Sequence, residues 1–146
     1  MGDDKLEKTE EIIKKWAKEI AEKESYANIK IKFCSLYISS KKSVRGNCNV
    51  EKNKINFNRV LIPLCVFYFE NYKEEIWEII LHEIAHLKKL EDSNKLTFYK
   101  SSDLKEGEYI DWHHHISFWK YLRKLREKYD KDKEQFYKEL QDVIAS

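Results

Sequence analysis

The segment His82-Glu83-Ile84-Ala85-His86 holds the residue types with the clearest chemistry in this sequence. Residues four positions apart on a helix lie one turn apart on the same face, so the imidazoles of His82 and His86 can bind one zinc ion. Glu83 reaches the same side without being a ligand, and its carboxylate can take a proton from a water molecule that zinc makes acidic. This spacing is the H-E-x-x-H signature of zinc-dependent metallopeptidases.

A catalytic zinc needs a third protein ligand and an open position for water. The three remaining histidines of the chain all lie in one run, His113, His114 and His115. Asp111 precedes this run and can orient one of its imidazoles through a hydrogen bond. An additional electrophile can come from Tyr109, His113 or His115, and the spacing alone does not choose among them.

The ligand pair requires a helix, and the surrounding residues favour one from Asn71 to about residue 89. Asn71 can cap its N-terminus, and Glu74 completes a capping-box-like pair three residues later. Apolar residues cover much of its circumference, so we expect this helix to be central to the core.

The rest of the chain predicts an α+β fold in one domain over residues 1–146, with an N-terminal helix, a three-stranded, mostly antiparallel sheet, the active-site helix and C-terminal helices. The expected helices cover residues 5–24, 116–128 and 131–145, the strands cover 29–38, 44–50 and 55–58, and a loop covers 91–107. The C-terminal segment, residues 131–146, is amphipathic. It is expected to pack on the core, and the alternative is that it covers the active-site cleft.

Composition excludes several functional classes. The net charge is +2, and lysine and glutamate are interleaved, so the charge pattern does not indicate a nucleic-acid-binding surface. No apolar run approaches the length of about 20 residues that a membrane-spanning helix needs, and the N-terminus does not resemble a signal peptide. The three cysteines are widely spaced and odd in number, which favours reduced thiols and a cytoplasmic protein.

Three stretches resemble the SprT-like metallopeptidase domain and its relatives, the YgjP-like and minigluzincin proteins. Residues 43–48, followed by residues 54–58, resemble the family's Gly-x-Cys element and the strand after it. Residues 79–87 are close to the family's active-site helix. In residues 114–119 the register matches, because the family places its third zinc histidine four residues before an aromatic residue, often Phe-Trp.

The resemblance implies a zincin-like fold in which zinc is bound by His82, His86 and His114, with Glu83 as the catalytic base. It also implies a protein or peptide substrate, which zincins commonly bind as an added strand at a sheet edge. Residues 43–50 are the expected edge.

Two departures from the family pattern leave the third ligand open. Residues 91–110 are inserted relative to the family, and His115 replaces the small residue that usually follows the third histidine. Some minigluzincins use a glutamate as the third ligand, so Glu106 and Glu108 are alternatives to His114. Relatives that act on DNA–protein crosslinks carry additional DNA-binding segments that are not visible in this sequence, so a DNA partner is not carried over.

Two other functions compete with a peptidase. The domain can be a zinc-binding module without proteolysis that acts through DNA or protein binding. It can also be a helical interaction protein without a metal. The composition of the metal's coordination shell separates these functions, because a catalytic zinc has three protein ligands and an exchangeable water.

Overall fold

The computed structural model describes the chain except residues 1, 40–41, 89–99 and 112. The α-helices of the described residues are α1 (Gly2–Lys23), α2 (Leu61–Phe67), α3 (Phe69–His86), α4 (Ile116–Lys128) and α5 (Asp130–Ala145). The strands are β1 (Lys30–Cys34), β2 (Tyr37–Ser39), β3 (Lys42–Ser43), β4 (Gly46–Asn49) and β5 (Lys54–Asn58). The predicted α+β fold, with its N-terminal and C-terminal helices, is confirmed.

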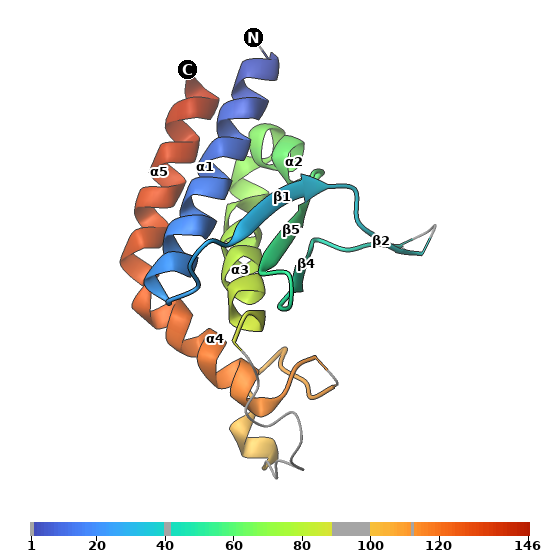
Figure 1. Cartoon of the computed structure of the whole chain (residues 1–146). Helices are drawn as coiled ribbons and strands as arrows, with labels where there is room; N and C mark the ends of the chain where they lie inside the picture. Colours follow the sequence, from blue (N-terminus) through green and yellow to red (C-terminus); the bar gives the residue numbers. More distant parts are fainter. Residues whose placement is uncertain (1, 40–41, 89–99, 112) are drawn as a thin grey trace.

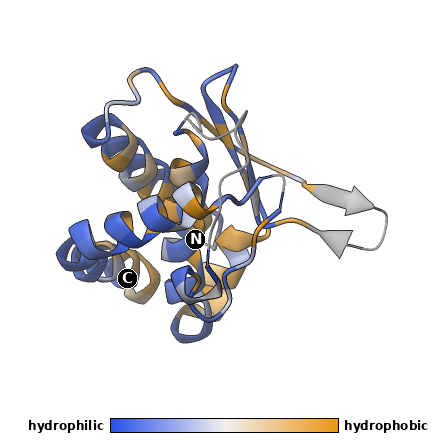
Figure 2. Cartoon of the chain, turned by 90° about the horizontal axis from the view of Figure 1, so that it is seen from below, coloured by the Kyte–Doolittle hydropathy of each residue, from blue (hydrophilic) through white to orange (hydrophobic). Residues whose placement is uncertain are grey.

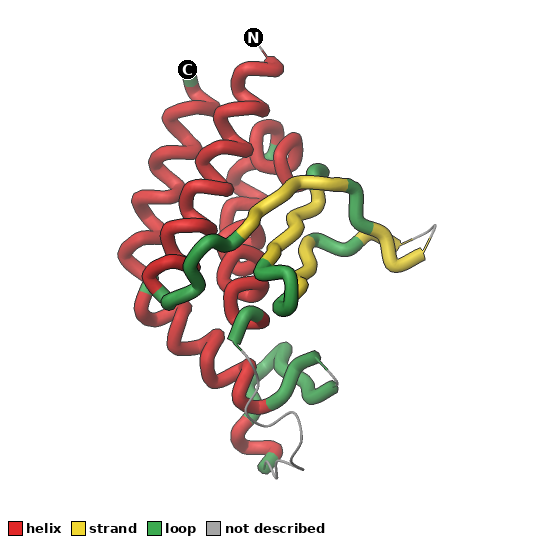
Figure 3. The backbone as a smooth tube through the Cα atoms, viewed as in Figure 1, coloured by secondary structure: helices red, strands yellow, loops and turns green. Residues whose placement is uncertain are grey.

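The helices and the strands lie on opposite sides of the molecule (Figure 3). Helices α1 and α5 run side by side, and the two ends of the chain lie close together (Figure 1). Apolar residues line the helix faces that turn towards one another, while hydrophilic residues face outwards (Figure 2). None of the described helices combines the length and the apolar character that crossing a bilayer requires.

The three-stranded sheet has β5 at its centre, in the order β1-β5-β4. Strand β4 pairs antiparallel with β5, and Gly46 lies opposite Phe57. Strand β1 pairs parallel with β5, and Ile31 lies opposite Ile55. This parallel pairing departs from the mainly antiparallel expectation. After β1 the chain forms the separate β2–β3 pair and then β4 at the far edge, so β5 returns between β1 and β4 in the direction of β1.

Helix α3 begins at Phe69, two residues before the predicted start, and no side-chain hydrogen bond caps its N-terminus. The predicted capping role of Asn71 is therefore wrong. The reason is that α2, which the sequence analysis left unassigned, ends at Phe67, so α3 follows it after one residue. Pro63 is tolerated in α2 because it lies in the first turn, where backbone N–H groups have no partner within the helix.

The predicted loop over residues 91–107 lies partly outside the described residues. Its described part contains a short 3₁₀ helix at Ser101–Asp103, which the sequence analysis did not predict. Asp103 stabilises this turn, because its Oδ2 accepts a hydrogen bond from the backbone N–H of Lys100 at 2.9 Å. The turn precedes the segment that leads into α4.

Helix α5 packs against α1 and α3 through its apolar face. The ring of Phe136 lies 6.1 Å from the ring of Trp16 and 5.2 Å from that of Trp77. Beside these rings, Glu139 accepts hydrogen bonds from the ammonium of Lys15 at 2.8 Å and from the indole of Trp16. The C-terminal segment, residues 131–146, therefore packs on the core, which is the first of the two expectations from the sequence.

Candidate metal centre

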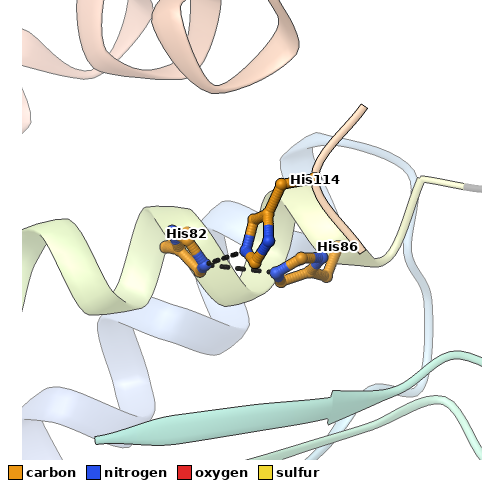
Figure 4. Close-up of side chains that lie close together, drawn as sticks. All are labelled: His82, His86 and His114. Atoms are coloured by element: carbon orange, nitrogen blue, oxygen red, sulfur yellow. Dashed lines mark hydrogen bonds between the residues drawn. The ribbon is translucent and has the colours of Figure 1, made fainter. Parts of the chain in front are cut away.

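The C-terminal half of α3 presents both histidines of the motif on one face. The Nε2 atoms of His82 and His86 lie 3.1 Å apart (Figure 4). Burial lowers the pKa of His82 to about 4 and that of His86 to about 3, and the neighbouring imidazoles add to this effect. Both rings are therefore neutral at pH 7, which is the form that binds a metal ion.

His114 reaches the same point from the segment before α4, and its Nε2 lies 3.2 Å from Nε2 of His82 (Figure 4). A turn closed by Asp111 holds it there. The Oδ1 atom of Asp111 accepts hydrogen bonds from the backbone N–H groups of His113 and His114, each at 2.8 Å. The same oxygen lies 2.9 Å from Nδ1 of His114. A carboxylate at Nδ1 keeps the proton on that nitrogen, so Nε2 presents a lone pair to the site.

The three imidazoles fit a zinc ion. One imidazole nitrogen from each of His82, His86 and His114 lies within 4.8 Å of the other two. No other group of three His, Cys, Asp or Glu side chains in the described part of the chain is so arranged. Zinc–nitrogen bonds of about 2.0–2.1 Å in a tetrahedral site place two ligand nitrogens about 3.3 Å apart. The two observed nitrogen separations of 3.1 and 3.2 Å are close to this value.

The other candidate third ligands considered from the sequence are His113, His115, Glu106 and Glu108. The structure does not bring them into this group. Glu108 is held by Arg123, whose Nε donates to its carboxylate at 3.0 Å, and this hydrogen bond lowers the pKa of Glu108. His115 precedes the first residue of α4 with an extended backbone, while His113 and Glu106 are exposed.

Comparison with known proteins adds no further identification. No family model, curated protein or solved structure matches this chain. The resemblance to the SprT-like group therefore stays a prediction. The assignment of a function rests on the chemistry of the site.

Glu83 is buried against the sheet, with 5% of its surface exposed. A Cβ atom at position 46 would lie 3.1 Å from both Cγ and Oε2 of Glu83, so the glycine at this position lets β4 approach the carboxylate closely. Burial raises the pKa of Glu83 to about 8. A divalent cation in the adjacent histidine group would favour the ionised carboxylate. Glu83 therefore has the environment of a group that exchanges a proton near neutral pH.

A cavity of about 280 Å³ opens beside His82 and Glu83. Residues 44–46 line it on the sheet side, and Glu75, Glu78 and Ile79 line it on α3. Its rim carries two ion pairs, one between Arg45 and Glu75 at 3.4 Å and one between Arg126 and Glu78, whose two hydrogen bonds measure 2.7 and 2.8 Å.

The sequence analysis did not predict the residues that line this cavity. The position of Glu78 was readable, because it lies one turn before His82 on the same face of α3. Its partner Arg126 is 48 positions away in the sequence, and no local pattern joins the two.

Aromatic rings enclose the imidazoles on the side of α4. The ring of Phe118 stacks on His86 at 4.4 Å, and Trp119 stacks on His114 at 5.6 Å. The indole N–H of Trp119 donates to the carbonyl oxygen of Tyr109 at 2.6 Å, and the Tyr109 ring lies 5.2 Å from His114. These contacts fix the ring planes of the histidines and limit the access of water from this side.

Strand β4 is an edge of the three-stranded sheet, and it borders the cavity through Gly46. An edge strand offers unpaired backbone groups to an added strand. Cys48 on the same strand is half-buried, and burial, together with the charge of Glu83, raises the pKa of its thiol to about 12. This thiol stays protonated at neutral pH.

Replacing Asp111 with Asn should weaken zinc binding about tenfold, because a carboxylate that is hydrogen-bonded to a ligand histidine contributes about 10- to 100-fold in metal affinity. The amide still accepts the two backbone hydrogen bonds of the turn but removes the charge at Nδ1 of His114. Competition with a chromophoric chelator measures the affinity. Asp103→Asn is the matched control, since this carboxylate lies in the same loop and accepts from Lys100. If the two variants bound zinc with equal affinity, Asp111 would not contribute to the zinc site.

Proposed function

We propose that this chain is a zinc-dependent metallopeptidase that hydrolyses peptide bonds. The convergence of His82, His86 and His114 beside the buried carboxylate of Glu83 carries the proposal. Three protein ligands next to an open cavity are typical of a catalytic zinc, whereas structural zinc sites are closed by four protein ligands.

The proposal also covers the family, the substrate and the cellular location of the protein. The SprT-like group, with its YgjP-like and minigluzincin relatives, remains the family that the motifs resemble. A protein or peptide is the proposed substrate. A cytoplasmic location agrees with the free thiols of Cys34, Cys48 and Cys65.

Zinc bound by the three imidazoles would act as a Lewis acid that polarises the substrate carbonyl and lowers the pKa of a water molecule. Glu83 accepts the proton of the attacking water and delivers it to the nitrogen of the leaving amine. Asp111 keeps the proton of His114 on Nδ1, so that Nε2 stays available as a ligand. Phe118 and Trp119 hold the imidazoles in place while the proton moves.

The edge of β4 supports a route by which a peptide substrate would reach this site. A peptide that adds to the edge of β4 runs past the cavity beside His82 and Glu83. The ring of Tyr109 lies 5.2 Å from the ring of His114, and 52% of the surface of Tyr109 is exposed. Of the three side chains considered as an additional electrophile, Tyr109 is the one whose ring contacts a ligand histidine and remains accessible to a substrate.

Zinc removal tests the proposal. The purified protein should contain zinc, cleave casein, lose this activity with 1,10-phenanthroline and regain it when zinc is added. Zinc should also raise the melting temperature, because a ligand at 100 times its Kd stabilises a protein by about 2.7 kcal/mol. Absence of bound zinc and of any thermal shift would reject the metal centre. Bound zinc without hydrolysis of any peptide would instead favour the non-proteolytic zinc-binding module.

A further inference from the structure

A second cavity, also of about 280 Å³, lies where α3 meets α4 and α5. Helix α3 supplies Glu74, Trp77 and Glu78 to its lining, and α5 supplies Asp130, Lys133 and Tyr137. Glu78 lines this cavity and also the one beside His82 and Glu83. The two cavities therefore adjoin along α3, separated by the Glu78–Arg126 ion pair.

The charges of the second cavity leave one carboxylate without a cationic partner. Arg126 pairs with Glu78, and Lys133 pairs with Asp130 at 3.4 Å. Glu74 is exposed and makes no ion pair with any described residue. This leaves one negative charge for a ligand to neutralise.

The base of the cavity is aromatic and contains an unsatisfied polar group. Trp77 and Tyr137 are 3% and 8% exposed. The Tyr137 hydroxyl is buried without a hydrogen-bond partner in the described part of the chain. Burial, with smaller contributions from the carboxylates of Glu74, Glu134 and Glu78, raises the pKa of Tyr137 to about 12, so the hydroxyl keeps its proton at neutral pH. Buried hydroxyls in folded proteins are nearly always paired, so this one is available to a ligand.

We propose that this cavity is a subsite for a basic side chain, lysine or arginine, of the peptide substrate. The proposal rests on the proposed function, because this cavity adjoins the one beside His82 and Glu83 along α3. The carboxylate of Glu74 can pair with an ammonium or guanidinium group. The aliphatic stem of that side chain can pack beside Trp77 and Tyr137, the Tyr137 ring also being contacted by the ammonium of Lys73 at 5.2 Å. The N–H groups of the basic side chain can donate to the Tyr137 oxygen. The volume suits one side chain, since pockets for drug-sized ligands begin at about 300 Å³.

The geometry of α3 also sets the position of the basic residue. Glu74 lies two helical turns before His82, which is about 12 Å at 1.5 Å per residue. An extended peptide advances about 3.3 Å per residue. The basic residue should therefore lie three or four residues from the bond that is cleaved.

A set of alanine-based decapeptides tests the subsite with the zinc-loaded protein. Each peptide carries a single lysine at a different position and is matched to a peptide with norleucine at that position. Mass spectrometry locates the cleaved bond. When the lysine is three or four residues from that bond, kcat/KM should be about fivefold higher for the lysine peptide than for the matched norleucine peptide. A factor of about five corresponds to the contribution of one well-formed ion pair. Glu74→Gln should remove the preference, and Glu74→Lys should turn it towards glutamate peptides. Glu70→Gln, an exposed acid of the same helix, should retain it.

Binding of the same peptides to the zinc-loaded Glu83→Gln variant separates this proposal from the proposed function. Fluorescence anisotropy should show about fivefold weaker binding of lysine peptides when Glu74→Gln is added. Cleavage without a preference for lysine, or with a preference that survives Glu74→Lys, would overturn the subsite and leave the peptidase intact. Glu74-dependent binding of lysine peptides by a parent that cleaves none of them would overturn the peptidase and leave the subsite.

Discussion

The Glu83→Gln variant is expected to bind zinc and to hydrolyse casein about 10²- to 10⁴-fold more slowly than the parent, the usual contribution of a general acid–base group. Glutamine has the shape of glutamate, so it preserves the close packing against Gly46. It cannot accept a proton from water. Burial already favours the uncharged form of Glu83, whose pKa is raised to about 8, so a neutral amide should not destabilise the fold. Zinc content, melting temperature and the rate of hydrolysis are the three measurements.

Glu70→Gln is the matched control for this experiment. It removes one carboxylate from the first turn of the same helix, where the side chain is exposed and pairs with Lys73 at 3.1 Å. The control should hydrolyse casein at the parental rate. Hydrolysis by Glu83→Gln at that same rate would show that the proton moves through another group and would refute the mechanism.

The part of the site carried by α3 could be predicted from the sequence because its geometry is local. One helical turn relates His82 to His86, and Glu83 lies between them in the same turn. The apolar run around these residues identified a buried helix, but the helix starts two residues before Asn71 and ends at His86 rather than at about residue 89. The error at Asn71 arose because capping signals are weak next to a tertiary contact, here the adjoining helix α2.

The convergence of His114 on α3 could not be derived from local physics. No local pattern in the sequence between His86 and His114 predicts that the chain returns to α3 at His114. Only the family register singled out His114 among three adjacent histidines. The contact with Asp111 was readable, because an aspartate closes a turn with the N–H groups that follow it.

Contacts between distant segments were invisible for the same reason. The approach of Gly46 to Glu83, the Arg126–Glu78 ion pair and the parallel pairing of β1 with β5 each join residues that no periodicity relates. The sequence pattern identified β1, β4 and β5 but not the separate β2–β3 pair. It did not give the order of the strands, because period-two patterning is the same for both directions of pairing.

The His114→Ala variant should lose more than 100-fold in zinc affinity, whereas His113→Ala and His115→Ala should retain it. A residue that only hydrogen-bonds to a ligand histidine already contributes about 10- to 100-fold in metal affinity, so removing a ligand itself must cost more. The reason for the difference is orientation. Nε2 of His114 faces His82 at 3.2 Å and its Nδ1 is held by Asp111, while the neighbouring imidazoles are not part of the group.

The same variants give a second readout that does not depend on catalysis. Zinc stabilises only a protein that binds it in the folded state, so the rise in melting temperature with zinc should persist in His113→Ala and His115→Ala and vanish in His114→Ala. Competition with a chromophoric chelator supplies the affinities. His114→Glu should recover part of the binding, because a carboxylate oxygen is also a zinc ligand. Loss of zinc in His113→Ala or His115→Ala, with retention in His114→Ala, would transfer the third ligand to that neighbour. The turn closed by Asp111 would then have to reopen when the metal binds, since in its present form it directs only His114 towards α3.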